Sequence, residues 1–154
     1  MQQPAGVQNL EDKYLVFQLG KDEFGMRVRT VKEIVGLQEI TAIPQAPPYV
    51  LGVVNLRGQV IPVIDLRRKF RMPEARYTER TCIIVVQLSQ QGSSALTGVV
   101  VDGVAEVMNI GSGEIQPAPD LIGGGDAGLY CRGMANVKGR LKILLDINRV
   151  MGKQ

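Results

Sequence analysis

Short stretches rich in apolar residues, separated by turn residues, run along most of the chain and predict β-strands rather than long helices. Thr81 to Leu88 carries apolar residues on both faces, which is typical of a strand buried on both sides. Leu66 to Phe70 and Ile147 to Met151 each follow an aspartate and are expected to form short helices. The other expected strands are 14–19, 24–28, 50–56, 60–64, 96–101, 104–110, 128–137 and 141–145. The pattern indicates an all-β protein with short helices.

Some segments carry no clear strand pattern. Thr30 to Val35 (TVKEIV) fits either a short helical turn, with Thr30 and Glu33 as a capping box, or a bent strand. Residues 1–12 are expected to form a flexible tail, and Gly111 to Gly128 an irregular glycine-rich loop. The polar stretch Arg71 to Arg80 is expected to be a boundary within the chain.

The chain contains an internal repeat. Gly52 to Phe70 (GVVNLRGQVIPVIDLRRKF) matches Gly133 to Met151 (GMANVKGRLKILLDINRVM), with Gly, Asn, Gly, Asp and Arg recurring in register. Phe24 to Val35 (FGMRVRTVKEIV) matches Thr97 to Met108 (TGVVVDGVAEVM) in the same way. We therefore expect two similar five-stranded β-barrels related by duplication.

The repeat predicts how the chain is divided. The first barrel is expected over about residues 13–72 and the second over about residues 80–152. Two halves of this size hold only small cores alone, so they are expected to share apolar surface. The seam between two such halves is a place where another molecule can bind.

Composition and charge narrow the classes of function. The chain is 45% hydrophobic and 21% charged, as expected of a globular protein, and its net charge of +3 is too small to indicate nucleic acid or an anionic membrane. The N-terminus lacks a secretory pattern, and no apolar run approaches the roughly 20 residues needed to span a bilayer. Cys82 and Cys131 are expected to be reduced thiols of a cytosolic protein.

The chain has no histidine, which excludes Ser-His-Asp and Cys-His catalysis. The glycine-rich stretches match neither a dinucleotide-binding nor a Walker pattern, and no clustered metal-ligand spacing occurs. We expect no catalytic residue, no metal site and no cofactor, and thus a protein that is not an enzyme.

The repeated sequences Asn55-Leu56-Arg57-Gly58 and Asn136-Val137-Lys138-Gly139 predict tight hairpins. Backbone geometry explains the glycine and the asparagine of such a turn. It does not call for a cation, yet both repeats carry one. Arg57 is therefore either an interface residue or a solvated hairpin tip.

Other charged residues have plain structural interpretations. Asp65 and Asp146 are expected to be helix N-caps. Glu33 and its match Glu106 are expected at a rim, either solvated or paired with a partner's cation. The basic run Arg67-Arg68-Lys69 is expected to be a solvated helix face, because few aromatic residues accompany it for stacking on nucleic acid.

With the segments YLVFQLG, FGMRVRTVKEIV, PPYVLGVVNLRGQVIPVIDLRRKF, GVVVDGVAEV and KILLDINRVM, the chain closely resembles the CheW chemotaxis coupling-protein family over residues 13–152. The resemblance implies two SH3-like five-stranded barrels packed about a hydrophobic seam. It also implies a non-enzymatic adaptor that couples methyl-accepting chemoreceptors to the histidine kinase CheA. The alternative is a similar scaffold of a non-flagellar pathway, with surface motility or a second messenger as its output.

The resemblance also implies partners, location and contact residues. The groove between the barrels would take the hairpin tip of the chemoreceptor, and the barrel ends would bind the CheA regulatory domain through residues that we do not name. The protein would lie in cytoplasmic arrays at the inner face of the membrane, without inserting into it or binding nucleic acid. The receptor-binding residues implied in this way are Val31, Glu33, Ile34, Gly52, Asn55, Arg57, Cys82, Val104 and Val107.

Overall fold

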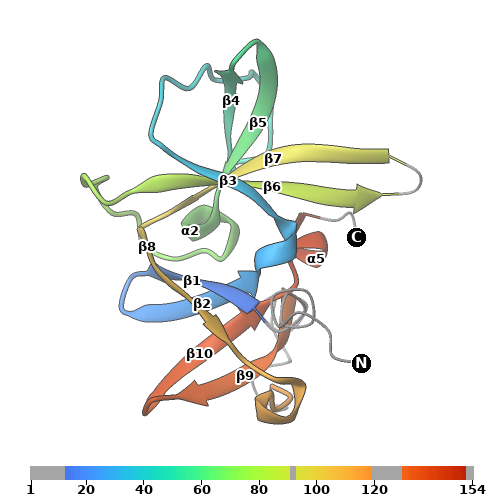
Figure 1. Cartoon of the computed structure of the whole chain (residues 1–154). Helices are drawn as coiled ribbons and strands as arrows, with labels where there is room; N and C mark the ends of the chain where they lie inside the picture. The colour runs from blue at the N-terminus through green and yellow to red at the C-terminus, as the bar shows by residue number, and fades with distance from the viewer. Residues whose placement is uncertain (1–12, 91–92, 119–129, 152–154) are drawn as a thin grey trace. The chain divides into compact units, whose positions relative to one another are not determined.

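The computed structural model describes residues 13–90, 93–118 and 130–151, whose strands form two five-stranded sheets. The first has the order β8-β1-β2-β10-β9 and the second the order β3-β6-β7-β5-β4 (Figure 1), which confirms the expected all-β fold. The strands of the first sheet are β1 (Lys13–Leu19), β2 (Asp22–Arg27), β8 (Gly103–Asn109), β9 (Cys131–Val137) and β10 (Arg140–Leu145). Those of the second are β3 (Val31–Gly36), β4 (Val50–Leu56), β5 (Gln59–Asp65), β6 (Cys82–Gln90) and β7 (Ser93–Val101).

The helices are short, as the sequence predicts. Those that lie wholly within the described residues are the α-helices α2 (Leu66–Lys69) and α5 (Ile147–Met151) and the 3-10 turns η2 (Val28–Thr30) and η3 (Ser112–Glu114). The carboxylate of Asp65 accepts a hydrogen bond from the Arg67 backbone N–H at 2.9 Å, which confirms its N-cap role. None of the helices in the described part of the chain has the length and apolar character to span a bilayer.

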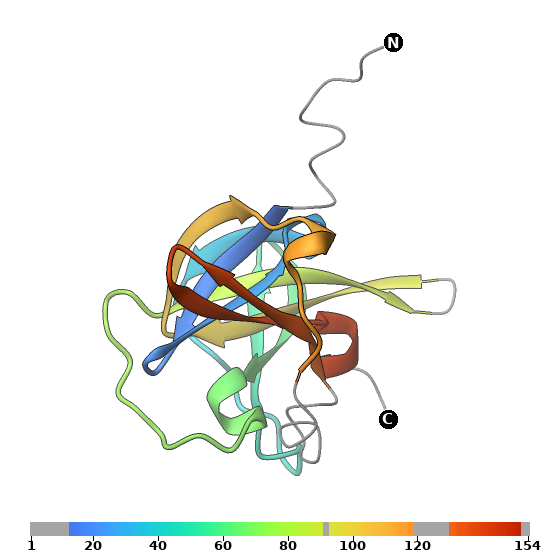
Figure 2. The same cartoon turned by 90° about the horizontal axis from the view of Figure 1, so that it is seen from below.

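Two sequence predictions fall on segments that the structure does not describe. The tail expected over residues 1–12 lies outside the described residues, and so do residues 119–128 of the expected glycine-rich loop. The polar stretch expected as a boundary follows α2 and connects it to β6, and Figure 2 shows it as a loop.

The ambiguous segment Thr30 to Val35 is a strand. Its residues from Val31 form β3, which pairs antiparallel with β6 from Val31↔Val86 to Gly36↔Cys82. The expected capping box does not form, because the hydroxyl of Thr30 instead donates to the carbonyl of Arg27 at 2.7 Å. Pairing with β6 therefore decides between the two structures that the local sequence allows.

The sheets do not follow the contiguous halves 13–72 and 80–152 expected from the repeat. One compact unit, the first unit, takes the residues up to Thr30 and those from Val104, while the second unit takes Val31–Gly103. In the first unit β2 pairs parallel with β10, and in the second β5 pairs parallel with β7. The blue β1–β2 hairpin accordingly lies beside the red β10 in Figure 1. The division into halves is wrong because strand pairing crosses between the repeats.

Each unit has its own core, to which the outer strands of its sheet contribute. In the second unit Val35 of β3 packs on the same cluster as Val54 of β4, although these strands lie at opposite ends of the sheet order. In the first unit Met108 of β8 packs on the cluster that contains Ala135 of β9. Each sheet thus curls until its outer strands share one core, as in a small barrel.

Strand β6 confirms the prediction of burial on both faces. Ile83, Ile84, Val85 and Val86 are consecutive, so their side chains alternate between the two faces of the sheet, and all four are fully buried. Strand β6 lies between β3 and β7, so both of its backbone edges are paired as well.

A buried ion pair joins the parallel strands of the first unit. Lys142 on β10 is the neighbour of Glu23 on β2, and its ammonium lies 2.5 Å from the Glu23 carboxylate. The Lys142 side chain is only 5% exposed and that of Glu23 13%. The guanidinium of Arg140 also approaches Glu23, at 3.7 Å. The hydrogen bond from Lys142 lowers the pKa of Glu23 below its ordinary value, with smaller contributions from the charges of Lys142 and Arg140.

This shift predicts a pH dependence of stability. Because the pKa of Glu23 is lower in the folded than in the unfolded chain, its contribution is complete above the unfolded pKa and is lost as the pH falls through the folded value. We expect the urea midpoint of the wild type to fall more steeply from neutral to acidic pH than that of Glu23→Gln. Equal slopes for the two proteins would contradict this assignment.

Candidate functional site

The repeated sequence at the β4–β5 and β9–β10 hairpins forms the same turn twice. Arg57 and Gly58 have φ of 51° and 90°, and Lys138 and Gly139 have φ of 55° and 78°. Two successive residues at positive φ define the type I′ turn that suits the twist of a hairpin. The side-chain oxygen of Asn55 accepts from the Gly58 backbone N–H at 2.8 Å. Turn geometry thus accounts for Asn55 and Gly58, while Arg57 is left without a backbone reason.

Gly52 has a structural role of its own. Its φ is +146°, and a Cβ added there would lie 2.0 Å from the carbonyl oxygen of Thr41. Thr41 forms an isolated bridge with Val53, which brings the preceding segment directly against β4. The matching Gly133 has φ of +155°, and a Cβ added there would lie 2.7 Å from the carbonyl oxygen of Gln116. The repeated glycine therefore permits a close backbone approach in both units.

Arg57 and Glu33 form an ion pair within the second unit. The guanidinium of Arg57, at the β4–β5 turn, donates to the carboxylate of Glu33 on β3. The side chains are 70% and 33% exposed, so solvent screens the pair and its contribution to stability is small. Its effect is to hold two long charged side chains next to each other on an exposed surface. Glu33 is thus paired with a cation of its own chain, an arrangement that neither expected interpretation included, and its pairing with a partner's cation stays a prediction.

The apolar members of the predicted receptor-binding set lie mostly on β3 and β8. Val31 and Val104 are half-buried at matching positions of the two strands, whereas Ile34 and Val107 are exposed at matching positions. Cys82, the first residue of β6, is half-buried opposite Gly36, and burial raises the pKa of its thiol.

The structure gathers part of the predicted set in one unit. Val104 and Val107 belong to the first unit, and all the other predicted receptor-binding residues belong to the second. Within the second unit, β3 and the β4–β5 hairpin are joined by the Glu33–Arg57 pair. The groove expected between the barrels stays a prediction.

Sequence reasoning missed a second pair of matching exposed residues. Val60, on β5, is 63% exposed and lies opposite Asn55, and Leu141, on β10, is 53% exposed and lies opposite Asn136. The signal was present, since both are apolar residues that follow the hairpin turn at matching repeat positions. It was hidden because an apolar residue in a strand is usually assigned to the core. Each unit thus exposes one such residue beside its hairpin turn.

The basic run on α2 is not the free solvated face that we expected. The Arg67 guanidinium binds both carboxylate oxygens of Asp102, with Nε–Oδ1 at 2.9 Å and Nη2–Oδ2 at 2.7 Å. It also donates to the Pro73 carbonyl at 2.6 Å. The Lys69 ammonium lies 4.0 Å from the centre of the Tyr49 ring. Arg68 donates to the Pro48 carbonyl at 3.2 Å. All three cations therefore have contacts within the second unit, which gives no support to a nucleic-acid surface.

A polar pocket of about 250 Å³ lies next to α2. It is lined by Asp65, Arg67, Arg68, Glu74, Ala75 and Tyr77. The hydroxyl of Tyr77 donates to Asp65 at 3.4 Å, and burial raises the pKa of this phenol, with Asp65 adding to the shift. None of the predicted receptor-binding residues lines this pocket. In the described ranges, no group of three or more Cys, Asp or Glu side chains could hold a metal ion.

Comparisons with known proteins agree with this architecture. Residues 13–154 match the family model of the CheW-like domain. The chain is 36% identical to the chemotaxis protein CheW of Klebsiella aerogenes, over 92% of this chain and 82% of that protein. It is 30% identical to the protein FrzA of Myxococcus xanthus, over 90% of this chain and 82% of that protein.

A solved structure shares the fold. The crystal structure of the scaffolding protein TtCheW from Thermoanaerobacter tengcongensis superposes with a TM-score of 0.81 and 29% sequence identity, covering 94% of both chains. Together with the family model, this similarity extends over both units and both copies of the repeat. The chain therefore belongs to the CheW-like family of chemotaxis scaffold proteins.

Proposed function

We propose that this chain is a non-enzymatic adaptor that couples methyl-accepting chemoreceptors to the histidine kinase CheA. Membership of the CheW-like family supports a scaffold role. The observation that carries the receptor-binding part is the exposed Arg57–Glu33 pair next to Ile34 on β3. Charged groups held beside an exposed apolar side chain suit a reversible protein interface.

The backbone at Arg57 strengthens this argument. A non-glycine residue at positive φ costs on the order of 1 kcal/mol, and asparagine or glycine would be easier to accommodate at this turn. The same position in the second repeat is again a cation, Lys138, at φ of 55°. Turn geometry does not explain either cation, but of the two only Arg57 is paired, in the described part of the chain, with an acidic side chain beside an exposed apolar residue, Ile34. We therefore assign Arg57 to the interface rather than to a solvated tip.

The proposed receptor contact comprises the residues that the family resemblance implied. Of these, Ile34, Arg57 and Val107 offer exposed side chains, and Gly52 and Asn55 support the hairpin that presents Arg57. The partner would be the helical hairpin tip of a chemoreceptor, whose apolar and charged side chains would meet this surface. The full proposed set is Val31, Glu33, Ile34, Gly52, Asn55, Arg57, Cys82, Val104 and Val107.

The second partner would be the regulatory domain of CheA. Simultaneous binding of receptor and kinase would place the protein in a cytoplasmic array at the inner face of the membrane. Individually weak contacts suffice there, because many copies engage at once. Mixing the protein with a receptor cytoplasmic fragment and CheA should give a ternary complex and raise kinase phosphorylation. Failure of both, with all three proteins folded, would exclude the adaptor role.

Arg57→Ala is expected to weaken binding of the receptor hairpin by about 1–3 kcal/mol, as for an interface hot spot. The matched control is Lys138→Ala, which removes one positive charge from the same turn position of the other repeat, where φ is also positive. Titration calorimetry with a receptor fragment measures both. An unchanged affinity for Arg57→Ala would remove Arg57 from the site, and equal losses for both variants would indicate a general effect of charge.

A second candidate is a scaffold of the same kind in a non-flagellar chemosensory pathway. The similarity to FrzA, a relative that does not carry the CheW name, favours keeping this candidate. The two candidates differ in output, so deletion in the native host discriminates between them. Loss of swimming chemotaxis supports the first, whereas intact swimming with altered surface motility or second-messenger level supports the second.

A further inference from the structure

Each sheet combines strands of both repeats. The first repeat holds β1 to β5 and the second holds β6 to β10. The β1–β2 hairpin completes its sheet with β8, β9 and β10, and the β6–β7 hairpin completes its sheet with β3, β4 and β5. The two parallel strand pairs, β2 with β10 and β5 with β7, are where the repeats meet within each sheet (Figure 1).

Short links between consecutive strands prevent a repeat from completing its own sheet. Only Asp102 separates β7 from β8, and only Val28–Thr30 separates β2 from β3. In the second sheet β3 and β7 both run antiparallel to β6, so a strand in the place of β3 runs parallel to β7. If the second repeat were to complete its own sheet, β8 would have to take the place of β3 beside β6 and run parallel to β7. It would then start near the beginning of β7, roughly 20 Å from the point where β7 ends. The single linking residue spans only about 3.5 Å. A repeat therefore needs strands from another repeat, in the same chain or in a second copy.

The first ion pair that joins the repeats is not matched in the other sheet. Glu23 of the first repeat binds Lys142 of the second, at 2.5 Å. In the repeat alignment Glu23 corresponds to Leu96 and Lys142 to Ile61. Ile61 is buried in the core of the second unit, with Leu96 packed against the same cluster. One sheet thus has a buried charge pair where the other has two aliphatic side chains.

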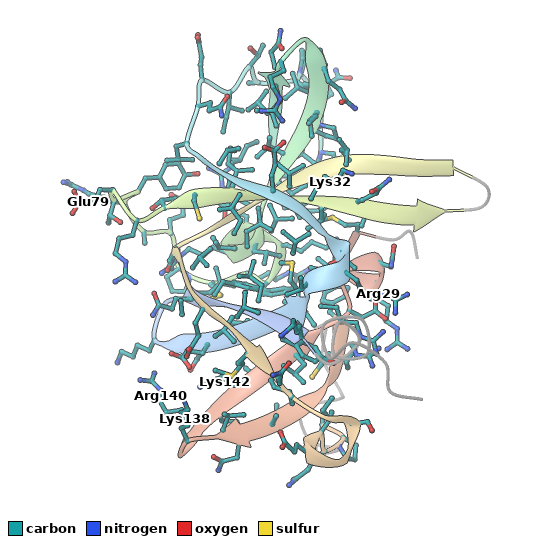
Figure 3. The ribbon with its side chains drawn as sticks, viewed as in Figure 1. Arg29, Lys32, Glu79, Lys138, Arg140 and Lys142 are labelled. Atoms are coloured by element: carbon teal, nitrogen blue, oxygen red, sulfur yellow. The ribbon has the colours of Figure 1, made fainter. Side chains whose placement is uncertain are left out.

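The second ion pair is likewise specific to its sheet. Arg67 of the first repeat binds Asp102 of the second through two parallel hydrogen bonds, a geometry that favours a defined orientation. Arg67 corresponds to Asn148, and Asp102 corresponds to Arg29, which is labelled in Figure 3. A basic residue in the first repeat therefore stands where the second repeat has the acidic partner of Arg67.

These differences would penalise association of like repeats. If β2 of one copy paired with β5 of a second copy, Glu23 would face Ile61 and lose its cation. If β7 paired with β10 of a second copy, Lys142 would face Leu96. In both cases a charge that is mostly buried would be left without a partner, which is strongly unfavourable. Figure 3 shows Lys142 and Arg140, the two cations next to Glu23, on β10 of the second repeat.

The Arg67–Asp102 pair also disfavours association of like repeats. In a pairing of two first repeats, Arg67 would meet Arg29 of the other copy, and attraction would become repulsion. We propose that the Glu23–Lys142 and Arg67–Asp102 pairs make the two repeats of one chain select each other and reject the like repeat of a second copy. The association that they exclude is between like repeats of two molecules. Unlike repeats of two molecules would keep both pairs, and tethering of the repeats within one chain favours the monomer over that exchange.

The test reverses one pair in the full chain. In Arg67→Asp/Asp102→Arg the native contact is restored with opposite signs, but the carboxylate introduced on α2 would now also attract Arg29 of a second copy. We expect this variant to fold, with a melting temperature below that of the wild type, because Arg67 also donates to the Pro73 carbonyl. Because Glu23–Lys142 still rejects like repeats in this variant, it is combined with Glu23→Leu/Lys142→Ile. After refolding from denaturant at high protein concentration, we expect the combined variant to give dimers and larger species. Size-exclusion chromatography with light scattering measures the distribution.

The control reverses a pair that lies within one repeat. Glu33→Arg/Arg57→Glu exchanges two charges of the first repeat that meet in the same sheet, so selection between repeats is unaffected and the refolded protein should stay monomeric. Glu23→Leu/Lys142→Ile is a second, independent variant. It replaces the buried charge pair of the first sheet with the two aliphatic residue types that the second sheet has at the matching positions. Exclusively monomeric refolding of the variant that combines all four substitutions would overturn the proposal. Oligomers in that variant but not in the control would support it.

Discussion

Replacing Gly52 with alanine is expected to destabilise the protein by about 3 kcal/mol. The backbone at Gly52 has φ of +146°, which side-chain-bearing residues rarely adopt, and the new Cβ would lie 2.0 Å from the Thr41 carbonyl oxygen. Relief would require Thr41 to move, and Thr41 is held by two backbone hydrogen bonds to Val53 at 2.9 Å. For a chain of this length the melting temperature should fall by roughly 6–12 °C, measured by circular dichroism.

Gly36→Ala is the matched control for this substitution. Gly36 also lies in a strand of the second unit, but an added Cβ meets nothing within 4 Å. Its replacement should leave stability nearly unchanged, since the alanine also restricts the unfolded chain. If Gly52→Ala melted within a degree or two of Gly36→Ala, close approach of the Thr41 segment would not be the reason for the repeated glycine.

Glu23→Leu is expected to cost about 3–5 kcal/mol, because it leaves the Lys142 ammonium buried without a carboxylate. The Lys142 side chain is 5% exposed, so water cannot replace the lost partner without opening the β2–β10 pair. Urea unfolding at neutral pH measures the loss. Adding Lys142→Ile should recover most of it, since two aliphatic residues occupy the matching positions in the other unit.

Glu33→Leu makes the same chemical change at an exposed ion pair. Arg57 is 70% exposed and remains solvated when Glu33 is removed, so the expected cost is at most about 1 kcal/mol. The contrast between the two glutamates isolates the effect of burial. Losses of similar size at both positions would mean that burial of Lys142 does not govern the result.

Much of the fold could be predicted from the sequence because the signals involved are local. Alternation of apolar residues and turn chemistry predicted the strands and both tight hairpins, and Asp65 could be recognised as an N-cap. The local sequence did not decide Thr30 to Val35, because the choice depends on pairing with β6. Arg67 was misassigned because its partner, Asp102, lies in the other repeat.

The candidate site shows the same limit. Asn55 and Gly58 were explained from the turn alone, and the structure agrees. For Arg57 the sequence left two interpretations, and the structure adds an ion pair with Glu33 of the same chain. The interface role of Arg57 stays a proposal. Val60 and Leu141 were overlooked, because exposure depends on which strands cover a position rather than on residue type.

By itself the sequence determined the duplication, the strand-rich class, the two hairpin turns and the similarity to one family, since each is encoded in neighbouring residues or in their repetition. Only the tertiary structure decided which hairpin completes which sheet. That choice depends on parallel pairing between residues far apart in the chain, on links too short to allow a repeat to close on itself, and on two charge pairs whose members lie in different repeats. None of these can be recognised before the partners are known.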